Sequence, residues 1–243
     1  TGIAHYLEHM LFKGTDMLGT VDYKSEKVHL DSIETFYNEL GQTKDGEKRS
    51  SIQEKINDLN LKASEFAIPN EFNRLIEGFG GTGVNAFTSN DIIAYVSQFP
   101  AHQTQKWLSI NSHRFENPVF RLFQSELETV YEEKNRSMDN AFRMLFEQFF
   151  ANFFREHPYG QQTILGTKEH LKNPSIKKMK EYYDTYYISN NMTLMLAGNF
   201  DLKLTKEEIK KTFGKLKSGP DPKFVDVKEM PFNGREVVSK RLT

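Results

Sequence analysis

Short stretches with strand patterns interrupt a chain whose longer segments carry helical spacing. "VNAFT" and "IIAYVSQF" lie between residues 84 and 99, after a glycine-rich segment and before Pro100. Both predict strands, because β-branched and aromatic residues are bounded by turn residues. "MTLMLAGNF", at 192–200, has the pattern of a buried strand closed by Gly198. We therefore expect the fold to combine strands with helices.

The helical segments follow apolar residues spaced three and four apart. The first runs from about Ile3 to Phe12, and Gly14 is suited to end it. Residues 21–66 hold two such runs around "GQTKDGEKRSS", which predict an antiparallel helical hairpin whose second helix starts at Ser51 and Glu54 as a capping box. Further helices are expected over 103–115, over 121–154 with a break near 137–140, and after a capping box at Thr205 and Glu208.

Composition excludes several classes of protein and of metal site. With 32 Lys and Arg against 33 Asp and Glu, the net charge of -1 gives no electrostatic basis for binding nucleic acid or an anionic membrane. No run approaches the ~18 apolar residues of a membrane span. Since the chain has no cysteine, it has no disulfide scaffold, and a transition-metal site must use histidine and carboxylate.

Both ends read as cuts through a larger protein. Thr1 stands just before a helical pattern, and "VVSKRLT" at the other end reads as a strand cut short. Targeting information is then expected to lie outside the chain. The compartment stays open, with a periplasmic or other extracytoplasmic bacterial location as one expectation and the cytoplasm as the alternative.

The opening stretch "HYLEH" holds His5, Glu8 and His9 on the first predicted helix. At ~100° per residue the two histidines point about 40° apart, and Glu8 falls in the same arc of about 100°. Two imidazoles and one carboxylate leave a fourth position open on Zn²⁺, where the pKa of a water falls to ~7. Glu8 would take that proton as general base and pass it to a leaving amine. The competing interpretation is an ordinary helix with two surface histidines, but H-x-x-E-H is the inverzincin motif.

A third ligand is expected in the acidic stretch "SELETVYEEKN". Glu126 and Glu133 are seven residues apart and share a helix face, but are separated by ~10 Å along the axis. One should bind the metal while the other orients a ligand histidine. Glu132 points about 100° away, and the residues alone leave it open as the ligand. A solvated acidic helix face is the simpler alternative.

Five segments occur in the order typical of one enzyme family. They are "TGIAHYLEHMLFKGT", "GGTGVNAFTSNDIIAYVSQFP", "ELETVYEEKN", "HPYGQQTILGT" and "YYISNNMTLMLAGNFD". In this the chain resembles the N-terminal catalytic domain of insulinase/pitrilysin zinc metallopeptidases, and the likeness covers nearly everything except the hairpin. The resemblance implies zinc ligands at His5, His9 and Glu133, with catalytic roles for Glu8 as general base and for Glu126.

The resemblance also implies a fold and a way of holding substrate. The fold would be α+β, an antiparallel-rich mixed sheet with helices mainly on one face, as in mitochondrial processing peptidase, plus the inserted hairpin. A peptide would add to the edge strand, where Asn85 and Ala86 would contact its backbone and Phe87 would bind substrate or belong to the core. A turn asparagine and a packed alanine are the simpler interpretations of the first two.

We expect residues 1–218 to form the catalytic domain, with the insert at about 21–66, and residues 219–243 to form a connector and the start of a following element. The expected function is that of a zinc-dependent endopeptidase for extended peptides or small unfolded proteins. A second homologous domain or subunit would complete its chamber, so the isolated chain would be weakly active. The alternatives are a non-catalytic scaffold or recognition subunit and a metal enzyme that hydrolyses another bond.

Overall fold

The computed structural model describes residues 1–224, 226–239 and 241. Its fold combines helices with one antiparallel pair of strands, so the expected α+β class is confirmed. The elements are α1 (Ile3–Met10), α2 (Tyr23–Gln42), α3 (Gly46–Ser64), α4 (Glu71–Gly78), β1 (Thr82–Thr88), β2 (Ile93–Gln98), α5 (Thr104–Glu116), α6 (Phe123–Met138), α7 (Ala141–Phe153), α8 (Pro158–Gln161), α9 (Lys168–Leu171), α10 (Ile176–Tyr186) and α11 (Leu202–Lys211).

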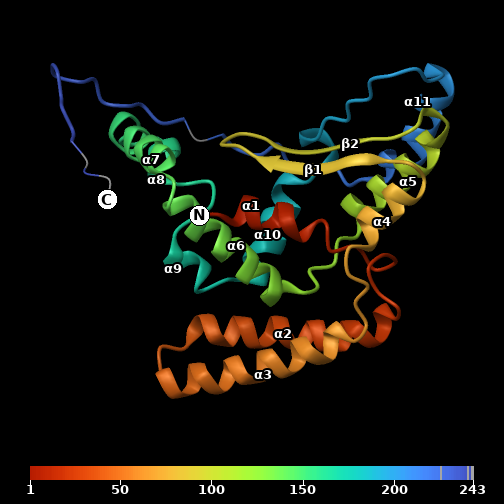
Figure 1. Ribbon diagram of the computed structural model, residues 1–243, viewed down its shortest axis with the longest axis horizontal. Coiled ribbons are helices and arrows are strands. Elements are labelled where there is room, and N and C mark those ends of the chain that lie inside the picture. The colour runs from red at the N-terminus through yellow and green to blue at the C-terminus, as the bar shows by residue number, and fades with distance from the viewer. Residues whose placement is uncertain (225, 240, 242–243) are drawn as a thin grey trace.

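The sheet is a two-stranded hairpin that lies across α1 (Figure 1). Thr88 stands opposite Ile93 next to the turn, and Asn85 stands opposite Val96. The register shifts between Thr82 and Asn85, at Gly83, whose φ of 61° suits glycine. The sheet is thus smaller than the mixed sheet expected from the sequence.

The strand predicted over 192–200 is not formed. Residues Met192, Leu194 and Leu196 are half-buried and their neighbours are exposed, so the segment alternates as a strand would. These three side chains pack against the core, yet no described segment pairs with their backbone. The segment is therefore neither paired nor fully buried, and the prediction of a buried strand was wrong. Residues 237–239, where a terminal strand was expected, are not in a strand either, and 240, 242 and 243 lie outside the described residues.

Helix α1 crosses the middle of the molecule and is buried on most of its surface. Leu7, Met10 and Leu11 have no exposed surface, and the helix ends at Met10, two residues before the predicted Phe12. Its start is fixed by a glycine pair: a Cβ on Gly2 would stand 2.9 Å from the Cα of Gly166. Both glycines have positive φ, so no other residue fits this close approach.

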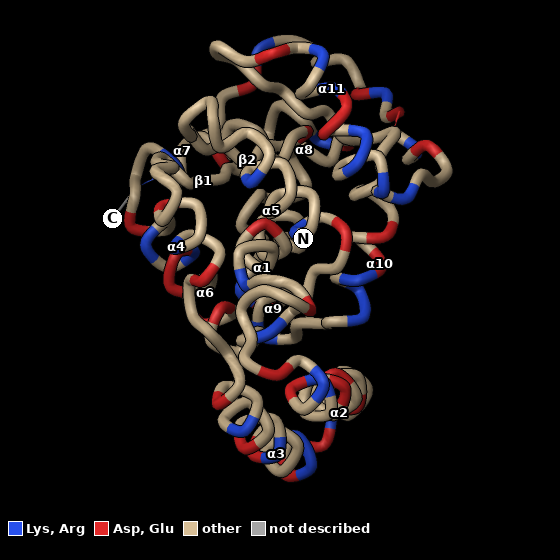
Figure 2. The backbone as a smooth tube through the Cα atoms, turned by 90° about the vertical axis from the view of Figure 1, so that its right-hand side faces the viewer, with Lys and Arg blue, Asp and Glu red and all other residues tan. Residues whose placement is uncertain are grey.

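Helices α2 and α3 form the predicted hairpin, a separate layer at the bottom of Figure 1. Apolar residues of both helices join the core that contains α1, with Ile33 and Tyr37 from α2 and Ile52 and Ile56 from α3 among them. Acidic and basic residues are mixed along both helices (Figure 2). The hairpin therefore packs on its own domain along one face.

Helices α3 and α11 begin at aspartate caps and not at the predicted capping boxes. Asp45 accepts a hydrogen bond from the backbone N–H of Lys48, so α3 starts at Gly46 and Ser51 lies inside the helix. Asp201 likewise caps α11, and Thr205 lies inside it. The predicted break of the long helix is confirmed, because α6 ends at Met138 and α7 starts at Ala141.

A buried ion pair joins the hairpin to the rest of the domain. Arg121, just before α6, and Glu26 of α2 are almost fully buried, and the Nε and Nη2 of Arg121 donate to the two carboxylate oxygens at 2.8 and 3.1 Å. The remaining donors bind backbone carbonyls after α1: Nη1 donates to Lys13 and Leu18, and Nη2 to Thr15, at 2.7 to 2.8 Å. All five N–H groups of Arg121 are thereby satisfied.

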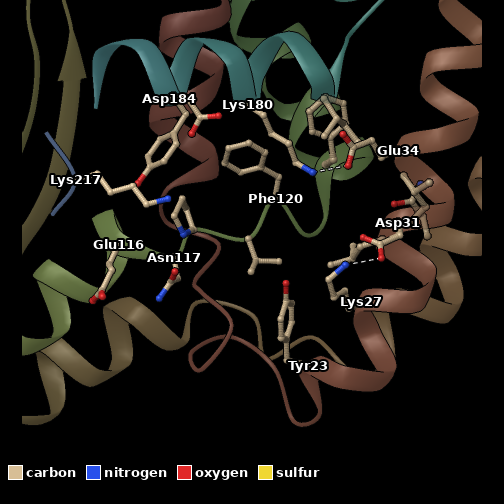
Figure 3. A pocket seen from close by; sticks show the side chains of 18 residues that line it. Tyr23, Lys27, Asp31, Glu34, Glu116, Asn117, Phe120, Lys180, Asp184 and Lys217 are labelled. Carbon is tan, nitrogen blue, oxygen red and sulfur yellow. Dashed lines mark hydrogen bonds and ion pairs between the residues drawn. The ribbon is translucent and has the colours of Figure 1, made fainter. Parts of the chain in front are cut away.

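A cavity of about 300 Å³ lies beside this junction, between α2, the loop at 116–120 and α10. Its rim carries ion pairs of Lys27 with Asp31 and of Lys180 with Glu34 (Figure 3). None of the predicted metal ligands lines it. Among the described helices, none combines the length and the apolar character that crossing a membrane requires.

Candidate metal centre

Helices α1 and α6 bring His5, His9 and Glu133 together, although Glu133 is more than a hundred residues away in the chain. The Nε2 atoms of His5 and His9 lie 3.4 and 3.6 Å from Glu133 Oε2. The two rings are 4.7 Å apart and inclined by 65°. One ligand atom from each residue thus falls within 4.8 Å of the other two.

These distances fit a zinc ion. Bonds of about 2.0–2.1 Å in a tetrahedral arrangement separate ligand atoms by about 3.3 Å, close to the separations from Glu133. Two imidazole nitrogens and a carboxylate oxygen are donors that zinc accepts, and a fourth position stays open. Glu132 is exposed and accepts a hydrogen bond from Asn135 instead, so the structure places Glu133 and not its neighbour in the cluster.

Glu126 lies behind the cluster and is hydrogen-bonded to His9. One oxygen of Glu126 is 2.8 Å from His9 Nδ1, and the other pairs with Lys13. Because the Nδ1 of His9 is engaged, its Nε2 faces Glu133, and carboxylates commonly orient metal-binding histidines in this way. Glu126 therefore contacts the cluster through His9.

The two histidines differ in their protonation. Burial, helped by the nearby His9, lowers the pKa of His5 to about 4. Burial also lowers the pKa of His9, but the hydrogen bond and charge of Glu126 outweigh it and the net pKa is raised. For Glu126, burial is outweighed by the bonds to His9 and Lys13, so its pKa is lowered. His5 is consequently neutral near pH 7 and free to bind a metal.

Glu8 lies beside the cluster with only 6% of its surface exposed. Burial raises its pKa, while the hydrogen bond from Thr88 and the charge of His9 oppose the rise. The hydroxyl of Thr88 donates to Glu8 Oε2 at 2.5 Å. A carboxylate with a raised pKa in a buried position is a stronger base than an exposed glutamate.

The predicted substrate-binding residues lie on β1. Asn85 and Phe87 are exposed, Phe87 by 55%, whereas Ala86 is half-buried. Phe87 is therefore not a core residue. The Asn85 side chain accepts the N–H of Ala86 at 2.9 Å. Within the described residues β1 pairs only with β2, so its other edge is free.

Sequence reasoning missed two contacts of this site. Thr88 stands in the quoted "VNAFT" segment, and Lys13 follows the metal motif, but no role was predicted for either. The alternation of β1 gives a partial signal, because Thr88 shares the inward face with Ala86. The residues around Thr88 do not indicate that its hydrogen-bond partner is Glu8, 80 residues earlier.

Two family models match the chain. Residues 41–168, somewhat more than half of the chain, match the model described as Insulinase (Peptidase family M16). The chain belongs to the insulinase family of peptidases. Residues 175–243 match a second model, described as the Peptidase M16 inactive domain.

Individual relatives extend this likeness over nearly the whole chain. An uncharacterized zinc protease of Rickettsia felis is 23% identical over 99% of the chain, and zinc protease PqqE of Helicobacter pylori is 28% identical over 70%. The beta subunit of the mitochondrial-processing peptidase of Dictyostelium discoideum is 25% identical over 89%. The chain covers 46%, 38% and 36% of these relatives, less than half of each.

Two solved structures share the fold. A protease from Helicobacter pylori superposes with a TM-score of 0.65 at 24% identity, over 96% of this chain and 43% of the other. The first half of the periplasmic protease PqqL from Escherichia coli gives 0.59 at 20% identity, over 93% and 39%. The arrangement of α1, α6 and the β1–β2 hairpin thus belongs to a fold that proteases use.

Proposed function

We propose that this chain carries the zinc centre of a peptidase that hydrolyses peptide bonds in extended peptides. The observation that carries the proposal is the meeting of His5, His9 and Glu133 within 4.8 Å, next to the buried Glu8. The naming of several family relatives as zinc proteases supports zinc as the metal.

Each residue of the centre has a distinct task in this proposal. Zinc, when bound, polarises the scissile carbonyl and lowers the pKa of a water molecule to about 7. Glu8 takes a proton from the attacking water and delivers it to the amine that leaves, as a buried carboxylate of raised pKa can do. Glu126 keeps His9 aligned through its Nδ1.

The free edge of β1 would hold the substrate. An unpaired strand edge offers N–H and C=O groups that bind a peptide through its main chain, whatever its side chains. Asn85 and Ala86 lie on this strand, and exposed Phe87 can contact a substrate side chain. Unfolded segments, which can adopt the extended form, are therefore the expected substrates.

A second half is expected to complete the enzyme. The chain covers less than half of its relatives, and one structural neighbour is itself described as a first half. We infer that the isolated chain binds zinc but cleaves slowly, and that adding the remaining half increases peptide turnover. A purely recognition role is not favoured, because His5, Glu8, His9 and Glu133 are all present.

Zinc content and two variants test the proposal. After dialysis against metal-free buffer, elemental analysis should find about one zinc per chain. Glu8→Gln should retain the zinc and lose about 10²- to 10⁴-fold in turnover of an unstructured peptide, while Glu133→Gln should lose the zinc. A chain that takes up no zinc, or a Glu8→Gln enzyme as fast as the parent, would contradict the proposal.

A further inference from the structure

We propose that Thr88 is a positioning residue for the general base, fixing one oxygen of the Glu8 carboxylate and so coupling the substrate-binding strand to the group that activates water. This inference rests on the proposed peptidase function. It assigns a task to a residue of β1 that makes no contact with the metal ligands.

Thr88 of β1 is hydrogen-bonded to the Glu8 carboxylate. Its hydroxyl is the only hydrogen-bond or ion-pair partner of the Glu8 side chain among the described residues. The bond engages Oε2 and leaves Oε1 without a described partner. One oxygen is thus held while the other is available for proton transfer.

The hydroxyl direction is set by the strand. Threonine is β-branched and therefore has few accessible χ1 values. Thr88 ends β1 opposite Ile93 of β2, and in the following turn the N–H of Ser89 donates to the carbonyl of Ile92 at 2.8 Å. The Tyr159 hydroxyl donates to Asp91 of the same turn at 2.5 Å. The Thr88 backbone is accordingly held by its pairing with β2 and by the hydrogen-bonded turn that follows it.

The same strand would hold the peptide. Asn85 lies three residues before Thr88, about 10 Å along an extended strand. A peptide that pairs with the free edge of β1 would restrict this strand, and through Thr88 it would restrict the Glu8 carboxylate. Fixing a glutamate side chain costs conformational entropy, because its rotations are lost. If Glu8 is already fixed before the reaction, this entropy cost does not add to the activation barrier.

Three variants of the zinc-loaded enzyme, with its second half present, test the coupling. Thr88→Val keeps the shape and removes the hydroxyl, Thr88→Ser keeps the hydroxyl, and Thr185→Val makes the same change at an exposed position of α10. We expect kcat for Thr88→Val to fall about tenfold to 100-fold with KM changed less than about threefold, as for loss of a hydrogen bond to a charged group. Thr88→Ser should lie within about threefold of the parent, and Thr185→Val should be unchanged.

A second measurement needs no turnover. Crystal structures of the metal-free parent and variants should show the Glu8 carboxylate in one position in the parent and Thr88→Ser, and displaced in Thr88→Val. If Thr88→Val does not fold, Thr88→Ala takes its place in both experiments. Zinc content should be the same throughout.

The outcomes separate this inference from the proposed function. An unchanged kcat, a rise in KM alone, or an unmoved Glu8 in Thr88→Val would overturn the role of Thr88. A parent enzyme that binds zinc and cleaves no peptide would overturn the proposed function, and the Glu8 position in the crystals would still decide whether Thr88 holds it.

Discussion

Two polar clusters lie at helix α6, one just before its first residue and one along it, and they are built in opposite ways. Around Arg121 every N–H donor has a partner, from Glu26 or from backbone carbonyls. At the metal centre the Nδ1 of His5 is buried without a hydrogen-bond partner in the described part of the chain. There, 44% of the Glu133 side chain is exposed, although two imidazoles stand beside it.

The difference separates a structural cluster from a functional one. A buried polar network whose members are all satisfied fixes one arrangement of the chain. A network in which the Nε2 atoms of two histidines face a partly exposed carboxylate offers three donor atoms that could hold a metal ion. Substitutions at Arg121 should therefore change the stability of the fold, and substitutions at the centre should change metal binding.

The largest expected effect is that of Arg121→Met on stability. The change leaves the carboxylate of Glu26 buried without its partner, which typically costs about 3–5 kcal/mol. Urea denaturation of the metal-free protein, followed by circular dichroism, measures it. Glu133→Gln serves as the matched control and should change stability by less than about 1 kcal/mol. Equal losses in the two variants would remove the distinction between the clusters.

Glu126→Gln should weaken zinc binding by about tenfold to 100-fold, because it loosens the orientation of His9. Competition with a chromophoric chelator measures the affinity. Glu128→Gln changes an exposed acid on the same helix and should leave the affinity unchanged. An unaltered affinity in Glu126→Gln would assign Glu126 to the pairing with Lys13 alone.

The metal-free protein should lose stability on acidification because of His5. Its pKa falls from the ordinary 6.5 to about 4 on folding, so between these values the unfolded chain binds the proton more tightly. The loss develops as pH falls from about 6.5 to 4 and should be on the order of 2 kcal/mol. Denaturation at pH 7, 6, 5 and 4 should show a smaller loss in His5→Leu. His9, whose pKa is raised, contributes stability at low pH that disappears as pH rises.

The smallest expected effect is the loss of stability when the N-cap of α3, Asp45, is replaced, compared with replacement of the predicted cap, Ser51. Asp45→Ala removes the side-chain acceptor for the Lys48 N–H and should cost about 1 kcal/mol. Ser51→Ala lies inside the helix and should change stability by less than about 0.5 kcal/mol. Thermal denaturation of both variants compares them, and the reverse order would restore the predicted capping box.

Local patterns predicted local structure well. The helical spacing gave α1, the hairpin α2–α3 and the break between α6 and α7, and the strand patterns gave β1 and β2. The seven-residue spacing on one helix face gave the separate positions of Glu126 and Glu133, and the family resemblance assigned the ligand role to Glu133. These features depend on neighbours within a few turns of one helix or on a recognised motif.

What the sequence could not predict depends on distant partners. Residues 192–197 have the alternation of a strand, but a strand also requires a neighbour, and pairing is not encoded within the segment. The bond between Thr88 and Glu8 spans 80 residues, and that between Arg121 and Glu26 spans 95. The predicted cap of α3 was wrong for another reason: both Asp45 and Ser51 favour helix starts, and the helix begins at the earlier of the two.

The contact of Gly2 with Gly166 has a consequence for sequence variation. Neither residue touches the metal ligands, yet a single methyl group at Gly2 would meet backbone atoms at 2.9 Å and displace the start of α1. His5 lies three residues further on, so that displacement would reach the centre directly. In a library of random variants selected for activity, these two remote glycines should tolerate substitution as poorly as the ligands themselves.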